Sequence, residues 1–156
     1  MNKQTSKLAW HYTTGAKFKQ IVESGYLDPK KTATPPNEKP ILWFSKNQHF
    51  EPTAQKAVRL PNGQINSLGM MGTYEMGGGL IRFGYPVAKL TEYKKLCRQA
   101  GINMLDVFSL ERVGVSQGAK PADWMGTLKK IDIQDCIIEV FSGDAWVNVK
   151  GGSHNA

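Results

Sequence analysis

The sequence has little cysteine and no long apolar run. Its two cysteines, Cys97 and Cys136, are far apart in apolar patterns, which fits neither a disulfide framework nor the paired spacing of a zinc site. No apolar run reaches the ~18 residues that span a bilayer, and the first residues, Met-Asn-Lys-Gln-Thr-Ser-Lys, lack the apolar core of a signal peptide. We therefore expect a cytoplasmic protein in a reducing compartment.

Acidic residues are also scarce. The chain of 156 residues has 20 Lys and Arg against 13 Asp and Glu, a formal charge of +7, and a pI of about 9.4. This balance favours polyanionic partners, although the basic residues are scattered and suit a solvated basic surface equally well. With 40% hydrophobic residues, the composition predicts one globular domain over residues 1–150 and a flexible tail over 151–156.

The stretch Leu8-Ala9-Trp10-His11-Tyr12-Thr13-Thr14-Gly15 is rich in aromatic and β-branched residues and predicts a strand. Apolar residues at helical spacing follow it and predict a helix that Thr14 caps and Gly25 ends. His11 would then lie near the end of the strand, just before free N–H groups at a helix N-terminus that favour phosphates. A hydrogen-bonded core histidine is the structural alternative.

The rest of the chain predicts further strands and helices. The apolar run at 41–45 predicts a strand buried on both faces. The expected elements after it are a helix over 49–58, a long mobile loop over 61–79, a strand over 80–85, a helix over 91–101 that Thr91 caps, a helix over 103–113 that buries Leu105, Val107, Phe108 and Leu110, a turn-rich segment over 114–124, strands over 128–133 and 136–141, and a hairpin into 145–149.

Two of these stretches resemble the ADP-ribosyltransferase superfamily, in its His-containing branch. His11-Tyr12-Thr13 with residues 18–27 is similar to the opening of the DNA-modifying ADP-ribosyltransferase toxins and, more distantly, of the tRNA 2′-phosphotransferases. Leu42-Trp43-Phe44-Ser45 looks like the second motif of that branch. Together the two matches cover about a quarter of the chain. The resemblance implies a single α+β domain with a split mixed β-sheet and flanking helices.

The resemblance also implies an enzyme that transfers ADP-ribose from NAD to a macromolecule, with nucleic acid slightly favoured over protein as acceptor. The family has a catalytic Glu near the start of a late strand, and this chain has no Gln-x-Glu or Glu-x-Glu. By context Asp123 fits that position best, Gln117 second and Glu111 third. The implied roles are catalysis for His11 and Asp123, acceptor binding for Gln117, and NAD binding for Tyr12, Thr13, Phe44, Ser45 and Trp124.

Other functions stay open on the sequence alone. The missing Glu favours a catalytically silent domain of this fold that binds a nucleotide or nucleic acid. A small host- or phage-encoded interaction protein is a further possibility, with the Met-rich loop from Met70 to Met76 as its contact surface. Metal-dependent hydrolysis has least support, because His11, His49 and His154 show no ligand spacing.

Overall fold

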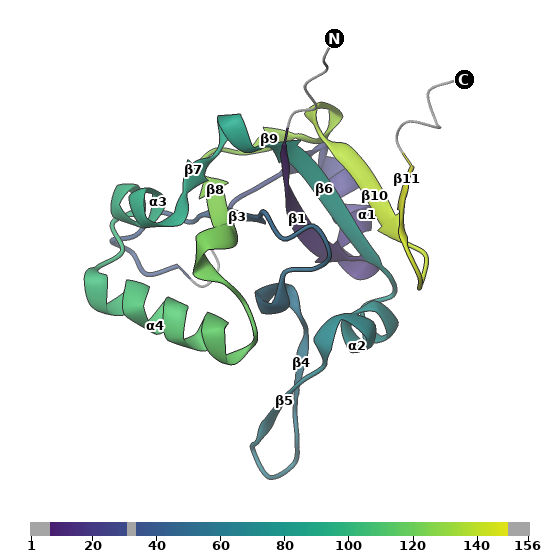
Figure 1. Ribbon diagram of the computed structural model, residues 1–156, viewed down its shortest axis with the longest axis horizontal. Coiled ribbons are helices and arrows are strands. Elements are labelled where there is room, and N and C mark those ends of the chain that lie inside the picture. Colours follow the sequence, from purple (N-terminus) through teal and green to yellow (C-terminus); the bar gives the residue numbers. More distant parts are fainter. Residues whose placement is uncertain (1–6, 31–33, 150–156) are drawn as a thin grey trace.

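An antiparallel sheet forms the centre of the molecule (Figure 1). The computed structural model describes residues 7–30 and 34–149, and the expected tail over 151–156 lies outside them. Within that range the sheet has seven strands: β1 (Leu8–Thr14), β3 (Leu42–Ser45), β6 (Leu80–Pro86), β7 (Thr91–Glu92), β8 (Trp124–Thr127), β10 (Ile137–Phe141) and β11 (Trp146–Asn148). They lie in the order β11, β10, β6, β1, β3, β8, β7.

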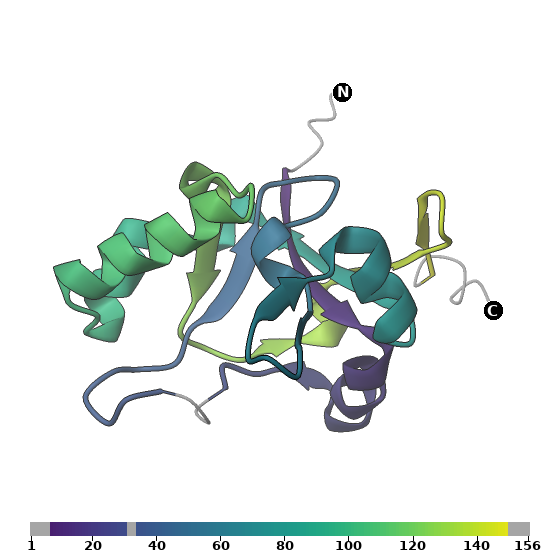
Figure 2. The same cartoon turned by 90° about the horizontal axis from the view of Figure 1, so that it is seen from below.

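Helices and smaller sheets surround these strands. The helices are α1 (Gly15–Ser24), α2 (Gly69–Met76), α3 (Tyr93–Ala100) and α4 (Met104–Ser116). β2 (Tyr26–Leu27) pairs with β9 (Ile131–Asp132), and β4 (Ala57–Arg59) pairs with β5 (Ile65–Ser67). Short 3-10 turns are η1 (Pro52–Ala54), η2 (Val87–Lys89), η3 (Pro121–Asp123) and η4 (Ile133–Asp135). Figure 2 shows α1 and α4 on opposite sides of the molecule.

The two faces of β1 enter two different apolar clusters, because successive side chains of a strand point to opposite faces. Ala9 belongs to the cluster on which Phe18 and Ile21 of α1 pack. Trp10 and Tyr12 belong to the cluster on the other face. The central strand is therefore covered on both sides, which holds its backbone and side chains in fixed positions.

The α+β class is confirmed, and the mixed sheet is wrong. Every strand pairing among the described residues is antiparallel. The strand expected at 128–133 is confirmed only over Ile131–Asp132, which form β9, since the chain pairs over β8, turns, and pairs again over β9. The strand over 136–141 and the hairpin into 145–149 are confirmed by β10 and β11.

The helix expected over 49–58 is wrong, because only three residues in it form a 3-10 turn and β4 begins at Ala57. Only η1 is helical there, and the Glu51 carboxylate accepts a hydrogen bond from the backbone N–H of Thr53 at its start. The loop expected over 61–79 is instead the return arm of the β4–β5 hairpin followed by α2. Gly63 takes a left-handed conformation, with φ of +89°, in the turn between the two arms.

The two helices beside β7 and β8 differ from expectation in opposite ways. Helix α3 buries Tyr93, Leu96, Cys97 and Ala100 as expected, although the Glu92 side chain rather than Thr91 caps it. Helix α4 buries only part of the face expected for it: Val107 packs on the cluster that contains Tyr93 and Trp124, whereas Leu105 is 75%, Phe108 54% and Leu110 40% exposed. Of the residues in α4, all of which the structure describes, Gly114 alone is buried. No helix among the described residues is long and apolar enough to cross a bilayer.

The N-terminus of α1 is not a free anion site. The backbone N–H groups of Gly15 and Ala16 donate to the carbonyl oxygens of Gly79, at 2.9 Å, and Gly77, at 3.0 Å. Thr14 occupies the cap position without a side-chain cap bond, and Gly25 ends the helix with φ of +82° as expected. The glycine-rich segment therefore stabilises the helix start and uses two of the N–H groups that were expected to favour phosphates.

A methyl group at position 15 tests this contact. A Cβ at Gly15 would lie 2.0 Å from the Gly78 carbonyl oxygen, so the backbone must shift. We expect Gly15→Ala to lower the free energy of unfolding by about 1–3 kcal/mol, the range for overpacking, and the Tm by about 2–4 °C for each kcal/mol. Thermal unfolding followed by circular dichroism measures it. Lys19→Ala, at an exposed position of the same helix, is the control; equal Tm values for both variants would contradict the contact.

Candidate functional site

A cavity opens where β1 and β3 separate. In the described part of the chain these adjacent strands pair at one position, Trp10 with Ser45. The cavity has a volume of about 530 Å³ and is lined by Trp10, His11, Tyr12, Trp43, Phe44, Ser45, Glu51, Thr53, Ala54, Leu110, Val113, Gly114, Gln117 and Trp124. A second hollow of similar volume, which borders the undescribed residues 31–33, is lined by none of the expected site residues. The first cavity is therefore the candidate site.

His11 bridges the gap between the two strands. Its Nδ1 lies 2.8 Å from the carbonyl oxygen of Trp43, and because a carbonyl only accepts, Nδ1 carries the proton. In the neutral ring Nε2 is then an acceptor. It has no partner among the described residues, and no described side chain leaves a buried nitrogen or oxygen unpartnered, so Nε2 is accessible at the cavity wall. The position suits an acceptor for a ligand hydroxyl.

The charge state of His11 follows from its surroundings. Burial lowers the pKa of His11 below its ordinary value of 6.5, and the positive charges of Lys17 and Lys30 lower the pKa further. The hydrogen bond to the Trp43 carbonyl acts in the opposite direction and is the smaller effect compared with burial. His11 is therefore neutral near pH 7, and Nε2 keeps its lone pair.

Glu51 provides a carboxylate at the cavity wall, and its side chain accepts four hydrogen bonds. Oε1 accepts from the Ser45 hydroxyl at 2.7 Å. Oε2 accepts from the N–H and hydroxyl of Thr53, at 3.1 and 2.7 Å, and from Trp124 Nε1 at 3.1 Å. Glu51 is only 6% exposed, and these donors offset the cost of burying its charge. Each carboxylate oxygen has two lone pairs, and Oε1 accepts a single bond, so Oε1 retains capacity for one more donor.

The chain between β3 and η1 places Glu51 through a series of local bonds. The Ser45 hydroxyl accepts from the N–H of Asn47, and the Asn47 side-chain oxygen accepts from the N–H groups of His49 and Phe50. Phe50 is buried in the cluster with Trp10. The sequence analysis missed Glu51 because it placed this residue inside a helix. In the sequence, Glu51 precedes Pro52 and lies two residues before Thr53. This is the arrangement of a side-chain cap on a 3-10 turn, and it was the signal available for Glu51.

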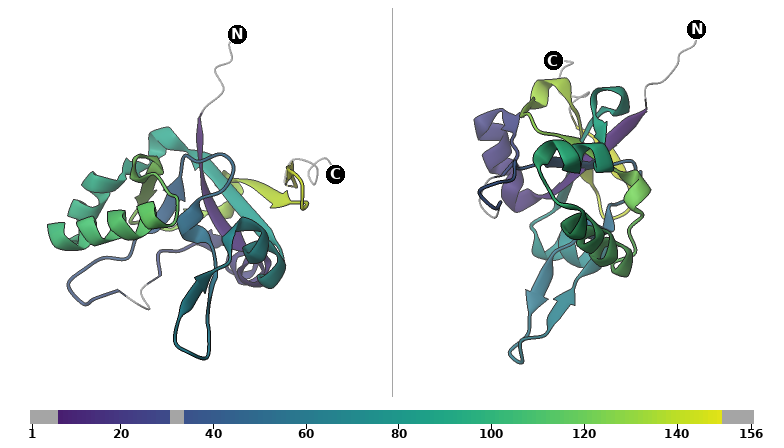
Figure 3. Two further views of the ribbon diagram at one scale, coloured as in Figure 1. Left: turned by 60° about the horizontal axis from the view of Figure 1, so that its bottom comes forward. Right: turned by 90° about the vertical axis from the view of Figure 1, so that its left-hand side faces the viewer.

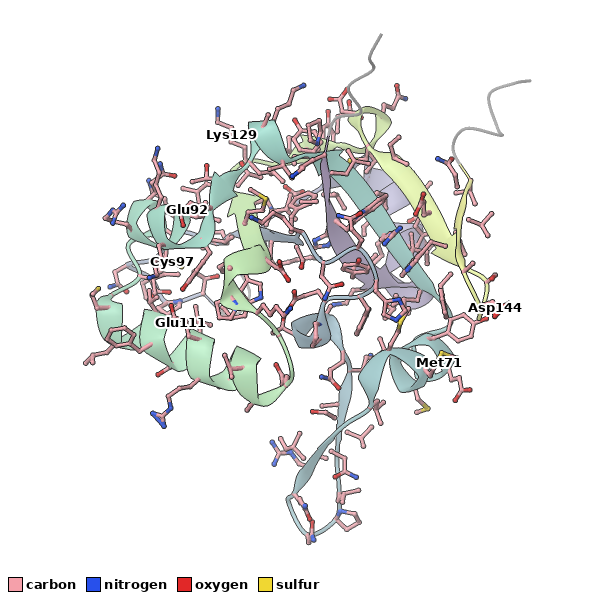
Figure 4. All side chains as sticks on the ribbon, in the orientation of Figure 1. Met71, Glu92, Cys97, Glu111, Lys129 and Asp144 are labelled. Atoms are coloured by element: carbon pink, nitrogen blue, oxygen red, sulfur yellow. The ribbon has the colours of Figure 1, made fainter. Side chains whose placement is uncertain are left out.

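Aromatic rings and helix α4 form the remaining walls. The Trp124 ring lies edge-on to Trp43, with ring centroids 6.4 Å apart, and to Tyr93, at 5.4 Å. Gly114 lets α4 approach, since a Cβ there would lie 2.4 Å from the Trp124 ring. Glu111 of α4 accepts a hydrogen bond from the Tyr93 hydroxyl, which ties α4 to α3, the region labelled in Figure 4. Burial and this carboxylate raise the pKa of Tyr93.

The structure brings together six of the eight site residues expected from the sequence. His11, Tyr12, Phe44, Ser45, Gln117 and Trp124 line the cavity. Thr13 is buried in the sheet and does not line it. Asp123 does not line it either. Its backbone joins two segments, because its N–H donates to the Lys120 carbonyl and its carbonyl accepts from the Lys46 N–H. Glu111, the third candidate for the acid, bonds to Tyr93 outside the cavity lining.

Tyr12 lines the cavity, but its hydroxyl is engaged elsewhere. It donates to the Asn47 carbonyl at 2.5 Å and accepts from Arg82 at 3.2 Å. Burial raises the pKa of Tyr12 to about 12. Arg82 in turn pairs with Glu139 at 2.6 Å and lies 3.8 Å from the Trp10 ring centroid. Tyr12 therefore contributes a fixed ring edge rather than a proton donor to the site.

The described residues, 7–30 and 34–149, contain no group of three or more His, Cys, Asp or Glu side chains that could hold a metal ion. The comparisons with known proteins add no assignment: no protein-family model, no curated protein and no solved structure matches this chain.

The lowered pKa of His11 makes the stability of the protein depend on pH. Because the folded pKa is lowered, the unfolded chain binds more protons just below pH 6.5, so stability decreases as the pH falls through that range. His11→Asn keeps an N–H for the Trp43 carbonyl but does not titrate. We expect the decrease in Tm between pH 7 and pH 5 to be smaller in His11→Asn than in the wild type. His49→Asn is the matched control. Equal decreases in Tm in the wild type and in His11→Asn would contradict the lowered pKa of His11.

Proposed function

We propose that the cavity binds the nicotinamide–ribose part of NAD and that the protein is an ADP-ribosyltransferase. The observation that carries the proposal is the presence, in one aromatic cavity at the gap between β1 and β3, of the Glu51 carboxylate and the acceptor nitrogen of His11. These are the groups that breaking a nicotinamide–ribose bond requires. The resemblance of 11–27 and 42–45 to the ADP-ribosyltransferase superfamily supports the same activity.

The size and walls of the cavity suit this ligand. Small-molecule sites have volumes of about 300–1,000 Å³ and mostly apolar linings with a few polar groups, and this cavity of about 530 Å³ fits that description. The rings of Trp43, Phe44 and Trp124 line it. Nicotinamide in NAD carries a positive charge, which favours the face of an aromatic ring. Phe44 also contacts the His11 ring, at 5.8 Å between centroids, so sugar and base contacts are adjacent.

The reaction breaks the bond between the nicotinamide nitrogen and C1′ of the ribose and forms a bond from C1′ to the acceptor. Nicotinamide leaves with the electron pair of the broken bond, and the acceptor releases one proton to solvent. The ribose passes through an oxocarbenium-like state with positive charge at C1′. A fixed carboxylate stabilises that charge, and we assign this role to Glu51. Its four donors hold it in place before the substrate arrives.

His11 acts by positioning. Its Nε2 accepts a hydrogen bond from a ribose hydroxyl, while Nδ1 remains bonded to the Trp43 carbonyl. Orientation of a reacting sugar lowers the activation barrier without any proton transfer by the histidine. Gln117, at the end of α4, lines the same cavity and suits a contact with the acceptor.

A catalytically silent nucleotide-binding domain is the second candidate. This candidate is favoured because the Glu51 carboxylate already accepts four hydrogen bonds within the protein. Three of them fall on Oε2, so only Oε1 has capacity left for a ligand. In that case Glu51 would be a structural group that ties the walls of the cavity together. NAD would then bind without being cleaved.

One pair of variants tests these assignments. With purified protein, NAD and cell nucleic-acid or protein fractions, nicotinamide release is expected to fall by about 10²- to 10³-fold in Glu51→Gln, the range for losing one strong electrostatic group. Asp123→Asn, which alters a carboxylate outside the cavity lining, is the control and keeps its rate. Thermal shift with millimolar NAD reports binding for each variant. NAD binding with no nicotinamide release by the wild type favours the silent domain, and a loss confined to Asp123→Asn overturns the assignment of Glu51.

A further inference from the structure

The β4–β5 hairpin projects from the body of the molecule. Figures 1 and 3 show it extending away between α4 and α2. Its two arms pair Ala57 with Ser67, Val58 with Asn66 and Arg59 with Ile65. Every residue from 61 to 67 is exposed. The hairpin therefore presents a two-stranded ribbon with solvent around its tip.

The base of the hairpin is firmly held. The backbone N–H of Lys56 donates to the Thr73 hydroxyl at 2.8 Å, and the N–H of Gly69 donates to the Gln55 side-chain oxygen at 2.7 Å. Thr73 is completely buried, and its hydroxyl donates to the Gly69 carbonyl. An isolated two-stranded hairpin is marginally stable in water, so this anchoring is what keeps the projecting arms in place.

The side chains on the hairpin are of one chemical kind. From residue 52 to residue 73 the chain has no Asp, no Glu and no aromatic residue. This stretch carries two cations, Lys56 and Arg59, and four amides, of which Gln55 lies at the base of the hairpin and Asn62, Gln64 and Asn66 lie on its exposed part. Arg59 donates one bond to the Gly63 carbonyl at 3.3 Å, which leaves most of its five N–H donors for a partner. Protein interfaces depend on aromatic and apolar anchors, which this ribbon lacks apart from isolated aliphatic residues such as Ile65.

We propose that the β4–β5 hairpin enters the major groove of double-stranded DNA. That groove is about 12 Å wide and 8.5 Å deep and admits a two-stranded ribbon, whose strands are about 4.8 Å apart. Arginine pairs with guanine edges and amides pair with adenine edges in this groove. The major groove of double-stranded RNA is deep and narrow, so side chains do not enter it. Charge and amides therefore suit a nucleic acid, and the shape of the ribbon favours duplex DNA over duplex RNA.

The hairpin joins the candidate site directly. Thr53 and Ala54 of η1 line the cavity, and β4 begins at Ala57. DNA held by the ribbon thus lies beside the cavity that the proposed function assigns to NAD. The role of DNA as the acceptor rests on that proposed function, whereas DNA binding by the hairpin does not.

Fluorescence anisotropy without NAD tests the binding. The probes are a fluorescein-labelled 20-base-pair DNA duplex, its single strand and the RNA duplex of the same sequence, over 50–200 mM NaCl. We expect the DNA duplex to bind most tightly. We expect Arg59→Ala to weaken that binding at least about fivefold, because it removes a contact to a base. If the Arg59 guanidinium also reaches the phosphate backbone, the slope of log affinity against log salt concentration falls by about 0.9, the value for one phosphate contact.

Lys129→Ala is the matched control, because it removes one exposed charge at the opposite end of the molecule from the hairpin (Figure 4). It is expected to bind the duplex like the wild type. Gln64→Ala is expected to weaken binding with no change in salt slope, since it removes no charge. Displacement by methyl green, a major-groove ligand, and not by netropsin, a minor-groove ligand, is the expected groove signature.

Several results would overturn the proposal. They are equal effects of Arg59→Ala and Lys129→Ala, equal affinity for the DNA and RNA duplexes, or displacement by netropsin alone. Hairpin-dependent binding of a protein without binding of DNA would assign the ribbon to a protein partner instead. Because NAD is absent, these outcomes leave the cavity untouched, and nicotinamide release by Glu51→Gln tests the cavity separately.

Discussion

The candidate site depends on the hydrogen bonds that the Glu51 carboxylate accepts. The carboxylate joins Ser45 at the end of β3 and Thr53 in η1, which are near it in the sequence, to Trp124 at the start of β8, which is distant. A buried carboxylate is stable only with such donors, and each hydrogen bond to a charged group contributes about 1.5–3 kcal/mol. The donors need Glu51 equally, because the Ser45 hydroxyl and the Trp124 N–H would otherwise lose a buried partner. The same network fixes the cavity wall and orients the one group suited to stabilise a cationic sugar.

The separation of β1 and β3 creates the space that this network borders. Two neighbouring strands that paired fully would leave no room between them for a ligand. Here the side chain of His11, rather than a backbone N–H, bonds to the Trp43 carbonyl. That bond keeps a strand carbonyl satisfied, sets the tautomer of the ring and leaves Nε2 at the cavity. Helix α4 closes the opposite side with Leu110 and Gly114, and its outer apolar residues stay exposed.

Local patterns in the sequence were sufficient for part of this arrangement. The apolar runs around His11 and Phe44 predicted two buried strands, and the buried face of α3 followed from the spacing of Tyr93, Leu96 and Cys97. The β4–β5 hairpin could not be predicted, because each of its arms is three residues long and neither arm has a row of buried apolar side chains. Asp123 was chosen by its place in the chain, whereas Glu51 is held at the cavity wall partly by a bond from Trp124, which lies on a strand distant in the sequence. Long-range side-chain bonds of this kind leave little trace in residue spacing.

The central claim is that NAD occupies the cavity with its ribose against His11. Nitrogen-15 NMR of the imidazole groups during titration with NAD measures this most directly, since it observes the two ring nitrogens separately. The account expects the His11 Nε2 resonance to shift with the occupancy of the site, while Nδ1 keeps the resonance of a nitrogen bonded to the Trp43 carbonyl. Saturation of the protein with NAD and unchanged His11 resonances would contradict it, as would the absence of any binding at millimolar NAD.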